Sequence, residues 1–132
     1  MKLRLHVDGG ARGNPGPAAI GVVIADARDE VIAELAERIG VATNNVAEYR
    51  AVLRALERAR ELGATEVEVV GDSELVARQL AGVYKVKHPA LKPLYEQATA
   101  ALRGFESWSV RSVPRDQNAD ADALVNAALD AP

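Results

Sequence analysis

The stretch MKLRLHVDGGARGNPGPAAIG, residues 1–21, decides how the chain begins to fold. Residues 2–8 alternate between apolar and polar side chains, which indicates a strand with one buried face. A turn rich in glycine and proline follows, and the apolar run Ala18–Ala25 predicts a second, buried strand. We therefore expect an antiparallel hairpin, with Asp8 at the end of its first strand.

The rest of the chain predicts three more strands and four helices. Val31–Ile39 has the pattern of a third strand, and Thr43 to Asn45 are good N-caps for an amphipathic helix that Gly63 ends. Asp72-Ser73 and Asn118 are candidate caps of two later helices. The later strands and helices are expected at 66–71, 74–81, 89–102, 106–113 and 119–129. This order, βββαβααβα, predicts an α/β fold in one domain, residues 1–132, with a five-stranded mixed sheet flanked by helices.

Composition excludes several classes of protein. The chain has 48% hydrophobic residues, which indicates a globular domain, and it has no cysteine for disulfides, zinc ligands or nucleophiles. No apolar stretch approaches the roughly 18 residues of a membrane span, so we expect a soluble, cytoplasmic protein. The net charge of −3 argues weakly against nucleic acid, although Leu75–Tyr95 holds basic residues and no acidic one.

Four carboxylates occupy positions where sites commonly form. Asp8 and Asp72 end two predicted strands that are often neighbours, and Glu48 and Asp122 lie in the first turns of two predicted helices. Four such groups would repel one another unless cations were present, and oxygen ligands select Mg²⁺ or Mn²⁺. A two-metal site suits phosphodiester hydrolysis, one ion activating water and the other stabilising the leaving oxygen. Neutralising four negative charges would change the net charge from −3 to about +1, which removes the objection to nucleic acid.

Each carboxylate also has an ordinary interpretation. Taken alone, each could be a surface or capping group, and Asp72 before Ser73 reads naturally as an N-cap. Asp120 lies about 200° around the helix from Asp122, so only one of the two can point inward. The glycine-rich turn lacks the Walker A and dinucleotide-binding patterns, so it is not a nucleotide-phosphate cradle.

Four ordered motifs together resemble type 1 ribonuclease H, in the archaeal-like branch that is also found in bacteria. They are DGGARGNPGPAAIG at 8–21, TNNVAEYRA at 43–51, GDSELV at 71–76 and VPRDQNADADALVNAALD at 113–130, and YKVKHPAL at 84–91 also fits that branch. The resemblance implies endonucleolytic cleavage of the RNA strand of an RNA–DNA hybrid, which leaves 3′-hydroxyl and 5′-phosphate ends.

The resemblance also implies roles for individual residues. Asp8 would bridge two Mg²⁺ ions, Asp122 would help hold the ion that activates water, and Glu48 and Asp72 would hold the other. Glu48 would also contact the 2′-hydroxyl, which distinguishes RNA from DNA. Arg115 stands where many family members carry a flexible-loop histidine, and we expect it to be auxiliary. The residues expected to contact the hybrid are Gly10, Arg12, Gly13, Asn14, Thr43, Asn44, Asn45, Tyr84, Lys85 and Lys87.

Two departures from the family pattern predict modest hybrid affinity with steep salt dependence. The basic protrusion of many members is largely missing, and Val41 stands where an arginine often precedes Thr43 by two. The resemblance implies a monomer without an obligate protein partner. Two alternatives remain open: another nuclease of the same superfamily, such as a junction resolvase or an exonuclease, and a catalytically silent hybrid-binding module.

Overall fold

The computed structural model describes residues 1–132 and contains the predicted elements in the predicted order. A short 3₁₀ helix, η1, is added before the last helix. The elements are β1 (Lys2–Ala11), β2 (Gly16–Ala25), β3 (Val31–Ala42), α1 (Asn44–Glu61), β4 (Glu66–Gly71), α2 (Glu74–Leu80), α3 (Lys92–Arg103), β5 (Ser107–Ser112), η1 (Arg115–Asn118) and α4 (Ala119–Asp130). No helix is both long enough and apolar enough to cross a membrane.

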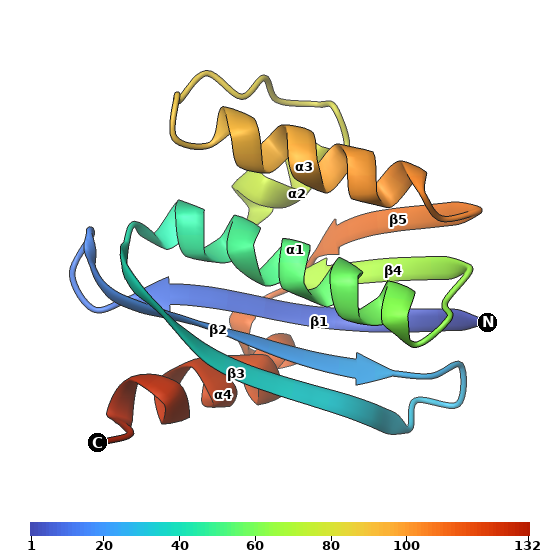
Figure 1. Ribbon diagram of the computed structural model, residues 1–132, viewed down its shortest axis with the longest axis horizontal. Helices are drawn as coiled ribbons and strands as arrows, with labels where there is room; N and C mark the ends of the chain where they lie inside the picture. Colours follow the sequence, from blue (N-terminus) through green and yellow to red (C-terminus); the bar gives the residue numbers. More distant parts are fainter.

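The five strands form one mixed sheet in the order β3-β2-β1-β4-β5. β1, β2 and β3 pair antiparallel as a meander, whereas β4 and β5 run parallel to β1 (Figure 1). The expected adjacency of the first and fourth strands is confirmed, since Leu5 pairs with Val69. The carboxyl ends of β1 and β4 therefore lie at the same edge of the sheet.

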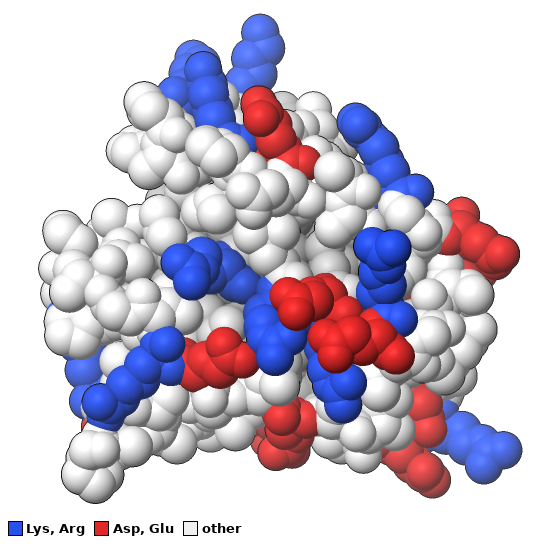
Figure 2. Space-filling view, in the orientation of Figure 1, with Lys and Arg blue, Asp and Glu red and all other residues white.

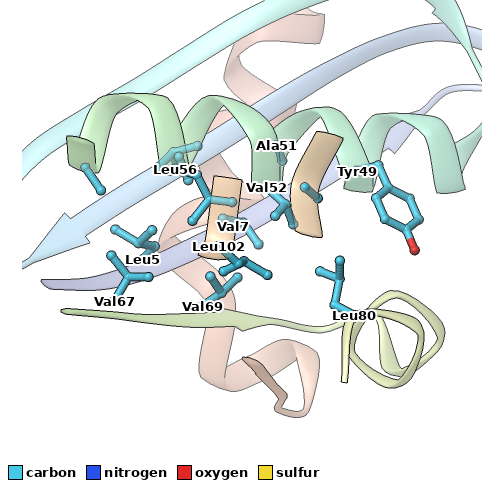
Figure 3. Packing of buried hydrophobic residues seen from close by; sticks show 14 of the residues in the cluster. Leu5, Val7, Tyr49, Ala51, Val52, Leu56, Val67, Val69, Leu80 and Leu102 are labelled. Carbon is cyan, nitrogen blue, oxygen red and sulfur yellow. The ribbon is translucent and has the colours of Figure 1, made fainter. Parts of the chain in front are cut away.

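Helices cover both faces of the sheet. Figure 1 shows α1, α2 and α3 on one face and α4 behind the other, against β2 and β3. The main core lies under α1, where Figure 3 shows Leu5 and Val7 of β1 and Val69 of β4 pointing toward Val52 and Leu56. Burying each such side chain contributes about 1.5–3 kcal/mol, so this interface fixes α1 on the strands that carry Asp8 and Asp72.

Several boundaries differ from the prediction. β1 continues through Gly9 and Gly10, which pair with Ile20 and Ala19, so Asp8 lies inside the strand and not at its end. Tertiary pairing here outweighs the low strand propensity of glycine. α3 begins at Lys92 instead of residue 89, with proline in its first turn, where the missing N–H has no helical partner to lose.

Candidate active site

Four carboxylates from separate elements line one cleft of about 470 Å³. Asp8 lies in β1, Glu48 in α1, Asp72 directly after β4 and Asp122 in α4. Ligand oxygens of Asp8, Glu48 and Asp72 all lie within 4.8 Å of one another. The structure therefore brings together the four carboxylates that the sequence singled out.

The carboxylate of Asp72 is not a helix cap. Ser73 caps α2, its hydroxyl accepting a hydrogen bond from the Val76 amide at 3.2 Å. Asp72 Oδ2 is buried and has no hydrogen-bond partner. The capping interpretation is thus wrong for Asp72, which instead offers a ligand oxygen within 4.8 Å of those of Asp8 and Glu48.

Glu48 reaches Asp8 because Gly9 lets α1 approach the sheet closely. A β-carbon at position 9 would lie 2.3 Å from the carbonyl carbon and oxygen of Ala47, which no real side chain tolerates. Thr43 caps α1 through a hydrogen bond from the Val46 amide at 3.2 Å. The sequence predicted Glu48 in the first turn of this helix. Because α1 begins at Asn44, Glu48 instead lies in the second turn.

A second glycine brings Asp122 to the cleft in the same way. A β-carbon at Gly21 of β2 would lie 2.4 Å from the Ala121 carbonyl oxygen, so α4 packs directly on that strand. Asn118 occupies the N-cap position of α4, as the sequence suggested, but its side chain makes no capping hydrogen bond. Its side-chain amide donates to the Val7 carbonyl at 2.8 Å and ties the start of α4 to β1.

Asp120 points away from the cleft. It is exposed and lines a separate cavity with His6 and Asn118, whereas Asp122 is half-buried in the cleft and accepts from the Asn126 amide at 3.5 Å. The expectation that only one of these two aspartates faces inward is confirmed.

Burial and mutual repulsion disfavour the state in which Asp8, Glu48 and Asp72 are all ionised. Burial, followed by the charges of Asp72 and Asp122, raises the pKa of Asp8 to about 7. Burial and then the charge of Asp8 raise the pKa of Glu48 well above its usual value. Burial also raises the pKa of Asp72, against which the positive charge of Arg115 acts. An all-oxygen donor set with one orphaned oxygen fits hard divalent cations, which would relieve this repulsion.

Two arginines lie along the cleft, each beside an acid. Arg115 Nε is 3.6 Å from Asp72 Oδ2, and the arginine side chain is 78% exposed. Arg12 Nη1 is 2.6 Å from Asp130 Oδ1, at the C-terminal end of α4. Arg115 therefore lies within electrostatic reach of the carboxylate cluster.

Two hydrogen bonds join the start of α1 to the β1–β2 hairpin. The backbone N–H of Asn44 donates to Asn14 Oδ1, and the backbone N–H of Ala11 donates to Asn44 Oδ1, both at 2.9 Å. Of the residues expected to contact substrate, Gly10, Arg12, Asn44 and Asn45 line the cleft. Gly13, with φ +91°, Asn14 and Thr43 support it from the turn and the helix cap.

Tyr84, Lys85 and Lys87 do not line the cleft. They lie in the segment between α2 and α3, where the Arg78 guanidinium is 5.4 Å from the centre of the Tyr84 ring. Figure 2 shows basic side chains gathered at the top of the molecule, over this segment. These residues can meet a substrate only if it extends well beyond the carboxylates.

Sequence reasoning missed the positioning roles of Gly9, Gly21 and Asn118. Gly9 belongs to the DGG run, but nothing local shows that a helix backbone covers it. Gly21, inside an apolar strand, carried the one available signal, because an isolated glycine there often marks a close backbone approach.

The comparisons with known proteins agree with this geometry. The Reverse transcriptase-like family matches residues 6–128. The crystal structure of RNase H1 from Halobacterium salinarum superposes with a TM-score of 0.96 at 45% identity, covering 98% of each chain. The chain belongs to the ribonuclease H family.

Two further relatives are similar over almost the whole chain. LC11-RNase H1, solved in complex with an RNA/DNA hybrid, gives a TM-score of 0.92 at 47% identity and covers 97% of this chain and 96% of that one. A bifunctional protein of Mycobacterium tuberculosis is 50% identical over 132 residues, 99% of this chain. The chain spans only 36% of that protein and 65% of the ribonuclease HI of Halobacterium salinarum.

Proposed function

We propose that this chain is a ribonuclease H, an endonuclease that hydrolyses the RNA strand of RNA–DNA hybrids and leaves 3′-hydroxyl and 5′-phosphate ends. The observation that carries the proposal is the carboxylate cluster: oxygens of Asp8, Glu48 and Asp72 within 4.8 Å, with Asp122 in the same cleft. Membership of the ribonuclease H family and the likeness to a hybrid-bound RNase H1 support this substrate.

The four carboxylates would hold two Mg²⁺ ions, with Mn²⁺ as a substitute. When bound, such ions stabilise charge that develops at a scissile phosphate and lower the pKa of an attacking water. Asp8 is central, since its carboxylate lies among those of Glu48, Asp72 and Asp122, and we assign it to both ions. Asp122 would serve the water side, and Glu48 and Asp72 the leaving-oxygen side.

Selection for RNA would come from the rim that Asn44 and Asn45 form beside Glu48. The Glu48 carboxylate would accept a hydrogen bond from a 2′-hydroxyl, which DNA lacks. The backbone of Gly10 to Asn14 would approach the minor groove, and Thr43 would contact a DNA phosphate. Tyr84, Lys85 and Lys87 would contact the distal part of the duplex. We further propose that residues 1–132 form one domain, which acts as a monomeric, cytoplasmic enzyme with no obligate protein partner.

Cleavage assays test the proposal directly. Labelled hybrid, duplex DNA, duplex RNA and a four-way DNA junction are incubated with Mg²⁺, with Mn²⁺ or with EDTA. We expect cleavage of the hybrid RNA strand alone, lost in EDTA and in Asp8→Asn, with Asp120→Asn as the charge-matched active control. Cleavage of duplex DNA or of the junction, or hybrid binding without turnover, would contradict the proposal.

A further inference from the structure

An ion pair joins two sides of the cleft mouth. Arg12 lies in the turn between β1 and β2, and Asp130 is the last residue of α4. Arg12 Nη1 and Asp130 Oδ1 are 2.6 Å apart, with the side chains 49% and 65% exposed. Arg12 and the neighbour of Asp130, Leu129, both line the cleft. A duplex entering the cleft would therefore meet this pair.

Helix stability does not explain an acid at this position. A negative charge at the C-terminal end of a helix opposes the helix dipole, and α4 has no basic residue in its last turn to offset it. The end of α4 is satisfied from elsewhere, since Arg38 Nε donates to the Ala128 carbonyl at 2.7 Å and Arg38 also donates to the Ala131 carbonyl. The polar partner of Asp130 is Arg12.

The two arginines of the cleft differ in what holds them. Arg115 lies beside Asp72, which belongs to the proposed metal-binding set, so cations bound there would compete for that carboxylate. Asp130 lies outside the cluster and does not line the cleft. The partner of Arg12 therefore keeps its full negative charge when the cluster is neutralised.

We propose that Asp130 lowers the affinity of the cleft for nucleic acid by occupying Arg12, which must exchange the carboxylate for a backbone phosphate when a hybrid binds. This inference rests on the proposed function. A guanidinium forms the same paired hydrogen bonds with carboxylate and with phosphate, so the two compete directly. An exposed ion pair is weak, which keeps the exchange reversible.

A double-mutant cycle tests the exchange. Equilibrium binding of a fluorescently labelled RNA–DNA hybrid is measured by anisotropy with Mg²⁺, in an Asp8→Asn background that prevents turnover. We expect Asp130→Asn to tighten binding about two- to fivefold, the equivalent of one exposed ion pair. In an Arg12→Ala background the same substitution should change binding no more than the charge-matched control Glu96→Gln, an exposed acid on α3.

Salt dependence gives a second readout. Because Arg12 contacts a phosphate in the complex with or without Asp130, the slope of log Kd against log salt should be alike in the wild type and Asp130→Asn, and shallower by about 0.9 in Arg12→Ala and Arg12→Ala/Asp130→Asn. Thermal melts check folding, and Asp130→Asn should not lower Tm, because it removes a charge that opposes the helix dipole.

Three outcomes would overturn the inference. They are unchanged binding in Asp130→Asn, equal tightening with and without Arg12, and equal tightening by Glu96→Gln. If the wild-type protein still cleaves the hybrid, these results overturn the role of Asp130 alone. If the wild-type protein neither cleaves nor binds the hybrid, the proposed function fails and the exchange fails with it.

Discussion

Gly9 of β1 lies directly beneath Ala47 of α1, so close that a β-carbon at position 9 would come within 2.3 Å of the Ala47 carbonyl. Each of these two residues is a sequence neighbour of a carboxylate of the cluster: Asp8 precedes Gly9, and Glu48 follows Ala47. The spacing between these two carboxylates therefore depends on the absence of a side chain at position 9.

Gly9→Ala should damage both stability and activity. Forcing α1 away from β1 is expected to cost about 1–3 kcal/mol or more, and a shift of Glu48 by about 1 Å can reduce hybrid cleavage on the order of 100-fold. Urea unfolding and cleavage assays measure the two effects. Gly10→Ala is the stability control, because its β-carbon would meet only Val125 Cγ1 at an ordinary 3.6 Å. Equal stability of the two variants would contradict the close-approach argument.

The fold was predictable where local pattern and tertiary structure agree. Alternation at residues 2–8, the helix signals after Thr43 and the run at 66–71 all specify their elements, and the order of elements leaves few sheet topologies. The convergence of the four carboxylates followed from that topology, because β1 and β4 are parallel neighbours.

The remaining features depend on contacts between distant segments. Asn118 has the residue type of a cap, yet its amide satisfies the Val7 carbonyl 111 residues away. Asp72 and Ser73 compete for one capping position, and only the structure shows that the serine occupies it. The Arg12–Asp130 pair joins opposite ends of the chain, and no local pattern predicts it.

Stability without metal should fall as pH rises. The pKa of Asp8 in the folded protein is about 7, above its ordinary value of 3.8, so the folded state keeps a proton that the unfolded chain releases between these two values. Stability is therefore lost across that window as pH increases. In EDTA at pH 8, Asp8→Asn should raise Tm on the order of 5 °C, about 1 kcal/mol for a domain of this size.

Added Mg²⁺ should make the wild type more stable than Asp8→Asn at pH 8, the reverse of their order in EDTA. An ion that binds only the folded state stabilises it, so Tm of the wild type should rise with Mg²⁺ at pH 8, while Asp8→Asn should lose most of that rise. Differential scanning fluorimetry at pH 5 and pH 8 measures both effects. A wild type that is more stable at pH 8 than at pH 5 in EDTA would contradict the predicted repulsion.

Asp122 and Asp120 should behave oppositely although they are two residues apart. Asp122 lines the cleft with the other carboxylates, whereas Asp120 is exposed beside another cavity. Asp122→Asn is expected to reduce hybrid cleavage on the order of 10²-fold, since it removes a negative charge from the proposed metal-binding set. Asp120→Asn should stay within about twofold of wild type, as surface substitutions usually do. Steady-state cleavage assays measure both variants. A larger loss in Asp120→Asn than in Asp122→Asn would show that the other face of α4 belongs to the site.

Arg115 should matter most at acidic pH. Burial raises the pKa of Asp72, and the charge of Arg115 opposes that rise across 3.6 Å. Removing the arginine should raise the Asp72 pKa further, so a larger fraction of this carboxyl is protonated at low pH and cannot hold a cation. Arg115→Ala should therefore shift the acidic limb of the activity profile to higher pH and cost about fivefold at pH 6, close to 1 kcal/mol. Arg115→Lys keeps the charge and should retain the wild-type limb, and a uniform loss across pH in both variants would instead indicate direct contact between the guanidinium and the substrate.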